Sequence, residues 1–455
     1  MEHPATVPAS PPPPPRRALA RLLVLLAPVV FACAAAGLYL RVEPFASWFF
    51  VFAWWSYILF LDGWNHLRSG HSLLLSRPRG FLCLLPWSTA FWLFFELCNL
   101  RLENWYYVGL PASAASRYVG IFVSFATVLP GTFETAELLR SFGVGEGRTC
   151  SAHTFRVTDA RRRALTALGW LFLALPLVFP RYAFPLIWGA TALLLEPWLA
   201  KRNETSLWSH LANGRPGTLL RLLAAGAICG LCWESWNFWA NAKWIYTVPF
   251  FEELKLFEMP LLGFLGFPAF ALECYTFSRA LVAAGLCPEW EPGLARRVVP
   301  RRRQLTWTAV AVLACLPAVW IVDRVIVRST AVQLEELRGL APADTDALRA
   351  AGIRDGHALG LALENWDRGE LLTAETLATV AQELELAHTA RMGARGVAWL
   401  TSIGVDGIDE LELQTPHRLV GQLLMEGEGP APEPTPAEVR YWVRAAGRRG
   451  DTPSW

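Results

Sequence analysis

Residues 95–111, FELCNLRLENWYYVGLP, and residues 233–249, WESWNFWANAKWIYTVP, carry one pattern of Glu-x-x-Asn, Trp-x-Tyr and Pro. The shared residues are Glu96, Asn99, Trp105, Tyr107 and Pro111 in the first stretch and Glu234, Asn237, Trp244, Tyr246 and Pro249 in the second. Other landmarks recur in the same order: Asp62, Trp64 and Arg68 correspond to Glu196, Trp198 and Arg202, and Pro130 with Glu134 corresponds to Pro268 with Glu273. The chain up to about residue 290 therefore indicates a duplication.

The residues that the two copies share are mostly carboxylates, amides and aromatics, although most positions around them have diverged. The surrounding stretches are apolar enough to enter a lipid bilayer. Polar groups kept at matching places in such stretches are candidates for a site.

Composition predicts a membrane protein. The chain is 53% hydrophobic and contains 22 Trp and 26 Phe. A helix needs about 20 mostly apolar residues to cross a hydrocarbon core of roughly 30 Å. Nine windows of this kind lie at 18–40, 47–64, 80–100, 118–140, 164–180, 182–200, 217–239, 258–284 and 305–327.

The distribution of Arg and Lys predicts the orientation, because cytoplasmic loops carry the excess of these residues. The N-terminal tail and the loops after the second, fourth, sixth and eighth windows, with the adjoining helix ends, hold 22 of them. The loops after the first, third, fifth and seventh windows hold six. We therefore expect an inner-membrane protein with a cytoplasmic N-terminus and, after nine crossings, a periplasmic C-terminal segment.

The first 17 residues are rich in Pro and are expected to form a disordered tail. The apolar run that follows resembles a signal peptide, but it continues past Cys33 to Leu40, which favours a retained helix. The cysteines lie mostly inside the apolar windows and do not imply disulfides. Cys229 and Cys232 have the spacing of a redox or metal motif, but the favoured interpretation is that they pack as small apolar side chains.

The duplication predicts the domain organisation. Four windows fall in each copy, so residues 18–142 and 161–285 form two repeats that enter the membrane in the same direction. A ninth helix at 305–327 leads to a helical domain at 329–425, and residues 426–455 form a linker and tail. The predicted fold class is all-α.

The C-terminal segment resembles a tandem helix-hairpin-helix domain. Leu337-Arg-Gly-Leu-Ala-Pro342 with Ala347 to Ile353 is similar to one unit, and Arg395 to Leu400 with Ile403 to Leu411 is similar to a second. In that family the hairpin glycines let backbone amides approach nucleic-acid phosphates. Here Ala341 replaces the second hairpin glycine of the first unit.

The charge of this segment opposes nucleic-acid binding. Residues 329–455 contain 11 Arg, no Lys and 20 Asp plus Glu, a net charge of −9. Phosphate binding needs a basic face. We therefore expect membrane lipids as partners of the helices, and membrane or periplasmic proteins as partners of the acidic domain.

Two layers of candidate site residues follow from the pattern. The outer layer combines Glu96, Asn99, Glu234 and Asn237 with Trp105, Tyr107, Trp244 and Tyr246 as walls, although an interfacial aromatic belt is the alternative for the rings. The inner layer combines Asp62, Arg68, Glu196 and Arg202 with Glu134 and Glu273, each of which follows a proline that can kink its helix. Arg68 and Arg202 are expected to pair with the acids or with lipid phosphates.

Buried carboxylates in a membrane normally face a partner, a cavity or water. Glu96, Glu234, Glu134 and Glu273 are therefore candidate proton donors or anchors, with interhelical hydrogen bonding as the structural alternative. Metal-ligand spacing and phosphate-binding loops are missing from the sequence, so we expect neither a metal nor another cofactor.

A further resemblance concerns Val248-Pro249-Phe-Phe-Glu252-Glu253 with Glu258-Met-Pro260, which looks like the membrane carotenoid (lycopene) cyclase family. That resemblance implies paired acids that protonate an isoprenoid double bond. The first copy has Pro111-Ala-Ser instead.

Three functions remain open from the sequence. The first is binding of, or action on, a lipid or isoprenoid at the duplicated site. The second is transport through a cavity between the repeats. The third is a scaffold or assembly subunit that docks through its C-terminal domain.

Overall fold

The computed structural model describes residues 14–40, 42–102, 104–108, 110–111, 113–246, 254–291, 294, 297–327, 332–353, 356–364, 371–389, 392–430 and 433–447. The chain divides into two compact units. Residues 1–102, 119–239 and 254–319 belong to the helical unit, and residues 103–118, 240–253 and 320–455 belong to the C-terminal unit. The predicted Pro-rich tail up to residue 13 and the motif from Val248 to Glu253 lie outside the described residues.

Among the described residues, eight helical segments are long and apolar enough to cross a membrane, which agrees with the predicted multi-pass helical protein. They are built from α1 (Pro14–Tyr39), α2 (Phe45–Ser69), α3 (Pro78–Leu102), α4 (Ala114–Phe125) with α5 (Val128–Ser141), α7 (Pro180–Ala183) with α8 (Ile187–Lys201), α10 (Gly217–Trp239), a 3₁₀ turn (Leu261–Leu265) with α11 (Gly266–Ala283), and α12 (Arg301–Val327). An apolar run in lipid becomes a helix because its backbone groups must bond internally.

The fifth predicted window corresponds to α6 (Asp159–Val178), which is not among these eight segments. Its first turns contain Arg161, Arg162 and Arg163, so the apolar part of this 20-residue helix is short. Thr158 caps the helix by accepting a hydrogen bond from the Arg161 amide. α6 is therefore a real helix whose composition alone does not mark it as a membrane span.

Both prolines that were expected to kink helices stand where a helix begins. The fourth predicted span is divided between α4 and α5, and Pro130 lies in the first turn of α5. Pro268 lies in the first turn of α11, directly after the 3₁₀ turn. Proline is tolerated there because the first N–H groups of a helix have no partner within it.

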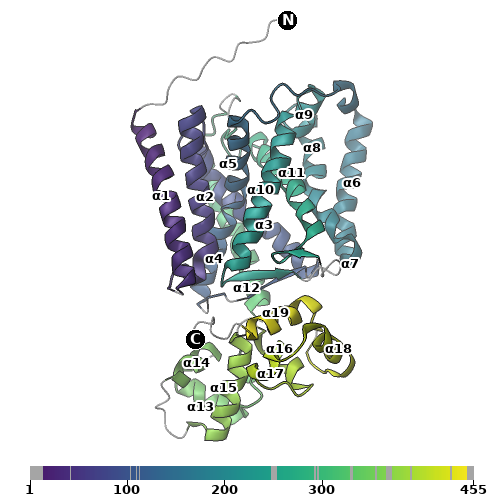
Figure 1. Cartoon of the computed structure of the whole chain (residues 1–455). Helices are drawn as coiled ribbons and strands as arrows, with labels where there is room; N and C mark the ends of the chain where they lie inside the picture. The colour runs from purple at the N-terminus through teal and green to yellow at the C-terminus, as the bar shows by residue number, and fades with distance from the viewer. Residues whose placement is uncertain are drawn as a thin grey trace, which may run out of the picture. The chain divides into compact units, whose positions relative to one another are not determined.

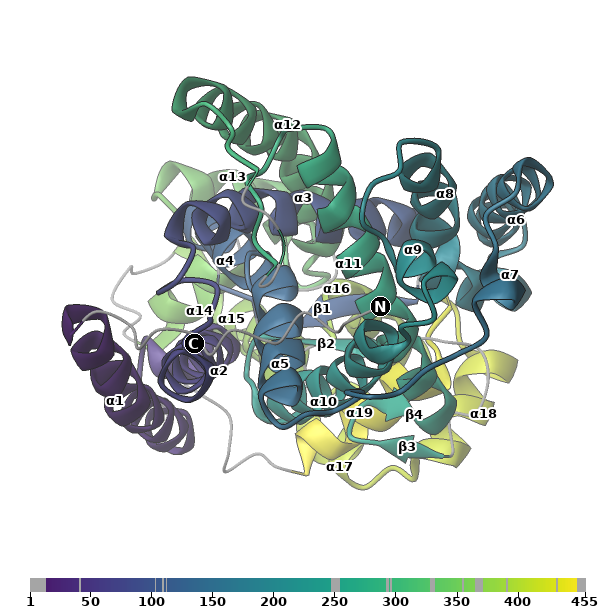
Figure 2. The ribbon, with the colours of Figure 1, turned by 90° about the horizontal axis from the view of Figure 1, so that it is seen from above.

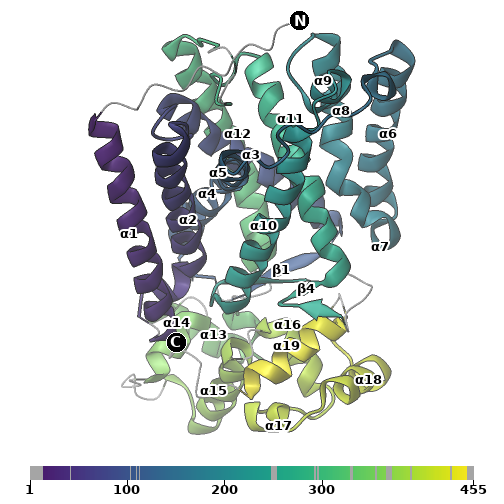
Figure 3. The ribbon, with the colours of Figure 1, turned by 45° about the horizontal axis from the view of Figure 1, so that its top comes forward.

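The helical unit places α5, α10 and α11 next to one another, with α2 packed on α5 and α8 on α11 (Figure 2). Further from this centre, α1 runs beside α2 and α6 runs beside α8 (Figures 1 and 3). Gly131 on α5 makes room for the Trp54 ring on α2, since a Cβ atom there would lie 2.7 Å from that ring.

The C-terminal unit contains a two-stranded antiparallel sheet of β1 (Trp105–Val108) and β2 (Lys243–Tyr246). The sequence had suggested interfacial loops at these places. A second small pair, β3 (Lys255–Leu256) and β4 (Met259–Pro260), belongs to the helical unit. The fold is therefore helical with two short exceptions among the described residues.

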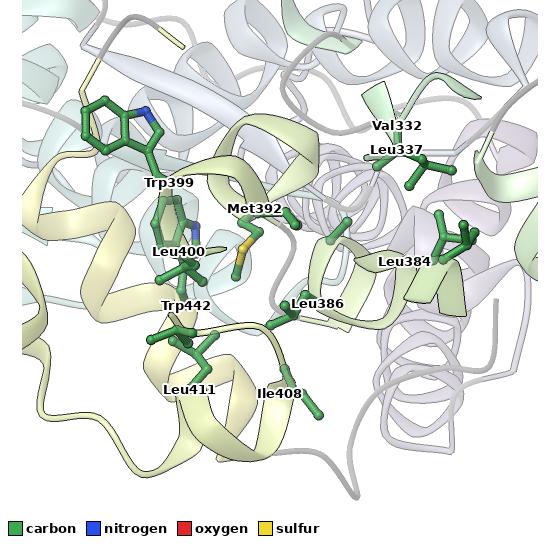
Figure 4. Close-up of a cluster of buried hydrophobic side chains, with 14 of the residues drawn as sticks. Val332, Leu337, Leu384, Leu386, Met392, Trp399, Leu400, Ile408, Leu411 and Trp442 are labelled. Carbon is green, nitrogen blue, oxygen red and sulfur yellow. The ribbon is translucent and has the colours of Figure 1, made fainter. Parts of the chain in front are cut away.

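The rest of the C-terminal unit is a helical domain with its own apolar core, part of which is drawn in Figure 4. Its helices are α13 (Pro342–Ala350), α14 (Gly356–Glu364), α15 (Ala374–Thr389), α16 (Gly393–Thr401), α17 (Ile408–Glu412), α18 (Pro416–Glu426) and α19 (Pro436–Ala446). Residues 436–446 were expected to belong to a tail, but they form α19. Val439, Trp442 and Ala446 share one face of this helix and are buried in the core.

Candidate functional site

Asp62 and Glu196 are used in the same way in the two copies. The Asp62 carboxylate accepts hydrogen bonds from the backbone amides of Leu74 and Leu75. The Glu196 carboxylate accepts them from Leu207 at 3.1 Å and Trp208 at 2.9 Å. Each acid thus ties the end of its helix to the segment that follows it, and both are buried.

Glu134 lies against Asp62. Its carboxylate accepts hydrogen bonds from the Asn65 side chain at 2.7 Å and from the Leu73 amide at 2.8 Å. The Asp62 and Glu134 carboxylates are thus neighbours, because they accept hydrogen bonds from consecutive amides of the segment after α2.

Glu273 does not take the equivalent place in the second copy. It accepts hydrogen bonds from the Thr191 amide and hydroxyl, both at 2.9 Å, five residues before Glu196 on α8. The residue of α11 that reaches Glu196 is Thr276, at 3.0 Å. In the second copy, the Thr276 hydroxyl therefore lies beside Glu196, whereas in the first copy the Glu134 carboxylate lies beside Asp62.

Arg68 and Arg202 do not pair with these acids. The Arg68 Nε donates to the Ser141 carbonyl at 3.1 Å, and its guanidinium lies 4.2 Å from the centre of the Phe142 ring. The Arg202 guanidinium lies 4.0 Å from the centre of the Trp198 ring. The sequence analysis predicted that these arginines pair with the acids or with lipid phosphates. Since they do not contact the acids, pairing with lipid phosphate stays a prediction.

Glu96 and Glu234 are buried among aromatic rings of the helical unit. The Trp92 Nε1 donates a 2.8 Å hydrogen bond to Glu96, and the Trp92 ring centre lies 5.0 Å from that of Trp233, next to Glu234. Asn237 is fully buried and Asn99 is partly exposed. Aromatic rings therefore pack beside both glutamates.

The two Trp-x-Tyr motifs form the sheet of the C-terminal unit. Trp105 is opposite Tyr246, and Tyr107 is opposite Trp244, with 6.4 Å between the ring centres of the latter pair. Each motif therefore pairs with the motif of the other copy. These rings belong to a different unit from Glu96 and Glu234.

A pocket of about 100 Å³ lies in the helical unit, at the C-terminal half of α5, the middle of α11 and the N-terminal end of α10. Its volume is several times the ~10–15 Å³ that one water molecule requires, but below that of a drug-sized ligand site. The pocket is lined by Ser72, Leu73, Phe133, Ala136, Glu137, Arg140, Thr218, Arg221, Leu222, Tyr275, Trp290 and Glu291. None of the four predicted catalytic glutamates lines it.

The charged residues of this pocket are unevenly paired. Arg140 donates two hydrogen bonds to Glu137, one of them at 2.8 Å. Glu291 accepts a 2.8 Å bond from the Tyr275 hydroxyl and lies 3.5 Å from Arg279, and burial raises the pKa of this carboxyl. Arg221 bonds the Val144 carbonyl and the Thr218 hydroxyl.

A histidine lies behind the pocket. The His210 Nε2 is 3.2 Å from the Tyr275 hydroxyl. Because that hydroxyl donates its proton to Glu291, its oxygen accepts, so the His210 Nε2 carries a hydrogen. Burial, assisted by Arg279 and Arg221, lowers the pKa of His210 to about 4. A chain of two hydrogen bonds therefore connects the neutral imidazole of His210, through the Tyr275 hydroxyl, to the Glu291 carboxylate at the pocket.

The sequence analysis did not select these residues, although signals for two of them were present. Arg221 is a cation inside an apolar window, which already indicates a function. Tyr275 follows Glu273 by two residues. The Trp290 ring, stacked on Phe133 at 4.0 Å, comes from a segment between windows and gave no signal.

The helix-hairpin-helix resemblance stays a prediction. In the first predicted unit, the segment before the hairpin is only a 3₁₀ turn, Leu334–Glu336. The Gly339 amide, in the hairpin, donates to the Glu383 carboxylate at 3.1 Å. Burial raises the pKa of Glu383. An internal carboxylate thus takes the place that a phosphate would need at this amide.

Comparison of the chain with protein-family models, with curated proteins and with solved structures found no match.

Proposed function

We propose that this chain is a multi-pass inner-membrane protein that binds the polar headgroup of a lipid or isoprenoid in the pocket between α5, α10 and α11. The observation that carries the proposal is the lining of this pocket: charged groups from α5 and α10 meet the aromatic rings of Tyr275 and Trp290. An amphipathic ligand needs such a mixture, because apolar walls take its chain and a few polar groups fix its head. A pocket of this size suits a headgroup.

The same proposal includes two parallel repeats. Trp54 and Trp188 hold matching positions in the two copies, eight residues before Asp62 and Glu196. Trp54 packs on Trp233 with 5.7 Å between ring centres, and Trp188 packs on Phe95 with 5.1 Å. Phe95 and Trp233 directly precede Glu96 and Glu234. Each copy therefore inserts an equivalent ring into the other, as a two-fold arrangement requires.

The register of β1 and β2 also fits a two-fold arrangement of the copies. Exchanging the two copies turns the pair Trp105 and Tyr246 into the pair Trp244 and Tyr107, which is also present. The pocket lies between residues of both copies, since α5 belongs to the first and α10 and α11 to the second. Binding between the repeats is therefore favoured over binding within one.

Binding is better supported than proton transfer by the predicted catalytic acids. Glu134 and Glu273, two of the four predicted catalytic acids, accept backbone amide hydrogen bonds of the chain itself, as do the predicted ligand-binding acids Asp62 and Glu196. A general acid must reach the substrate atom that it protonates. These four acids instead support the structural role that was the alternative, so the proposed ligand is held by the pocket.

The proposal is tested by filling the pocket. Ala136 lines it, so Ala136→Phe should occupy the space of a headgroup. Ala227→Phe, on the exposed face of α10, adds the same ring outside the pocket and is the matched control. The measurement is native mass spectrometry of the full chain purified in a neutral detergent.

We expect lipid to co-purify with the wild-type chain and with Ala227→Phe, and to be lost from Ala136→Phe. Equal lipid on all three folded proteins would overturn the proposed pocket. Absence of lipid from all three, even after lipid is added, would overturn the proposed function.

A further inference from the structure

We infer that the pocket binds an anionic group of the phosphate type, through Arg221 and Arg140. This inference rests on the proposed function, and it specifies the chemistry of the headgroup. Phosphate oxygens suit arginine because the planar guanidinium can donate two parallel hydrogen bonds.

Arg221 has donors to spare. A guanidinium carries five N–H groups. Arg221 uses them on the Val144 carbonyl at 3.3 Å and the Thr218 hydroxyl at 3.1 Å, both of which are neutral. Among the described residues it forms no ion pair, although Glu137, Glu146 and Glu291 are near enough to attract it. Within the described part of the chain, its charge is therefore not matched by a direct salt bridge.

The position of Arg221 on its helix adds to this imbalance. The residue lies in the second turn of α10, close to the N-terminus of a 23-residue helix. The N-terminal end of a helix carries a partial positive charge, which disfavours a cation and favours an anion. Arg140 is also near enough to repel Arg221. An anion between the two guanidinium groups would relieve both effects.

The backbone around Arg221 is fixed closely enough to hold such a site. Gly145 has φ of +78°, and a Cβ atom on it would lie 2.9 Å from the Cα of Gly217. This close approach brings the loop before α6 onto the start of α10 and presents the Val144 carbonyl to Arg221. The guanidinium is thus oriented before any ligand arrives.

The acids of the pocket are engaged elsewhere. Glu137 binds Arg140, three residues along the same helix. Glu291 is held by Tyr275 and faces Arg279. Arg279 in turn bonds Glu289 at 2.7 Å. Among the described residues, Arg221 is therefore the pocket cation that has no salt bridge, and Arg140 is a second cation that can share its donors between Glu137 and an anion.

Phosphate at this place could come from a lipid headgroup or from a soluble phosphate, and the experiment separates the two. The full-length chain in neutral detergent is titrated with dioleoyl phosphatidic acid, with dioleoylglycerol, which has the same chains without phosphate, and with inorganic phosphate. Binding is followed by native mass spectrometry and by the shift in the thermal unfolding midpoint. The variants are Arg221→Gln and, as a matched control, Arg215→Gln in the exposed loop before α10.

We expect phosphatidic acid to bind at least ten-fold more tightly than dioleoylglycerol. Loss of a charged hydrogen bond corresponds to roughly ten-fold or more in affinity. Arg221→Gln should therefore weaken phosphatidic acid at least ten-fold, whereas Arg215→Gln should change it less than two-fold. Arg221→Lys, which keeps the charge but not the planar fork, should fall between them.

Each other outcome has a definite meaning. Equal binding of phosphatidic acid and dioleoylglycerol overturns the anionic headgroup but leaves lipid binding in place. Binding of inorganic phosphate alone, lost in Arg221→Gln, keeps the anion site and overturns the lipid. No binding of any probe overturns both. If Arg221→Gln does not fold, the comparison of the three probes on the wild-type chain still tests the anionic headgroup, and Arg221→Lys tests the role of this residue.

Discussion

At the scale of single residues, the buried acids of the helical unit are explained by the backbone they hold. Asp62 and Glu196 each accept hydrogen bonds from two consecutive amides 11 to 13 residues further along the chain. A buried amide that lost such an acceptor would cost about 1–3 kcal/mol. Both copies need an acceptor for two backbone amides at this place. This requirement explains an acid at both positions without any catalytic role.

His210 makes the stability of the chain depend on pH. Its pKa is lowered to about 4 in the folded chain, against an ordinary value near 6.5, so the folded state resists protonation. This stabilisation is complete above about pH 6.5 and is lost as the pH falls towards 4. The loss amounts to about 3 kcal/mol at most.

The prediction is that His210→Gln removes this part of the acid sensitivity. A Gln side chain can still donate to the Tyr275 hydroxyl but does not titrate. The free energy of unfolding in detergent should fall more between pH 7.5 and pH 4.5 for the wild-type chain than for His210→Gln. His417→Gln, in the exposed start of α18, is the control and should behave like wild type. Identical pH profiles for all three proteins would contradict the assignment.

At the scale of elements, the helices were predictable and the strands were not. Apolar runs reveal helices because lipid leaves the backbone no other partner, and Pro130 and Pro268 mark the starts of α5 and α11. β1 and β2 are separated by the 134 residues from 109 to 242, so neither strand carries a local turn signal. Residues 436–446 were missed because a Pro/Glu-rich linker precedes the short apolar face of α19.

The pairing of β1 with β2 predicts an energetic coupling between Tyr107 and Trp244. Aromatic pairs contribute about 0.5–1.5 kcal/mol beyond burial. In a double-mutant cycle, Tyr107→Ala and Trp244→Ala should therefore be non-additive by about this amount in the free energy of unfolding. Tyr107→Ala combined with Trp399→Ala, whose ring packs in the core of the helical domain, should be additive. Additivity in both cycles would count against the register.

At the scale of the whole molecule, the apolar helices could be predicted from the sequence, but the pocket could not. Its walls come from α5, α10, α11 and two connecting segments, at positions between 72 and 291. No local pattern records which of these segments meet. The predicted site followed the residues that the copies share, whereas the pocket also includes residues that differ between them, such as Arg221, which corresponds to Cys83.

The pairing of β1 with β2 bears on the expected number of membrane crossings. β1 begins three residues after α3 ends, and β2 begins four residues after α10 ends. Because the strands pair, these helix ends must lie on one side of the membrane. That requires an even number of crossings between them. The segments α4 with α5, α7 with α8, and α10 would supply three, so we expect α6 to supply the fourth.

We therefore expect nine crossings, with the C-terminal domain on the opposite side from the loop that precedes α6. Arg148→Cys lies in that loop and Met425→Cys lies at an exposed position of α18. In intact cells, a membrane-impermeant maleimide should label Met425→Cys, and Arg148→Cys only after permeabilisation. The unsubstituted chain gives the background from its own cysteines, of which Cys33 is exposed. Because four crossings precede residue 148 in either count, labelling of both positions from one side would mean that α6 does not cross. The pairing of β1 with β2 would then have to be abandoned as well.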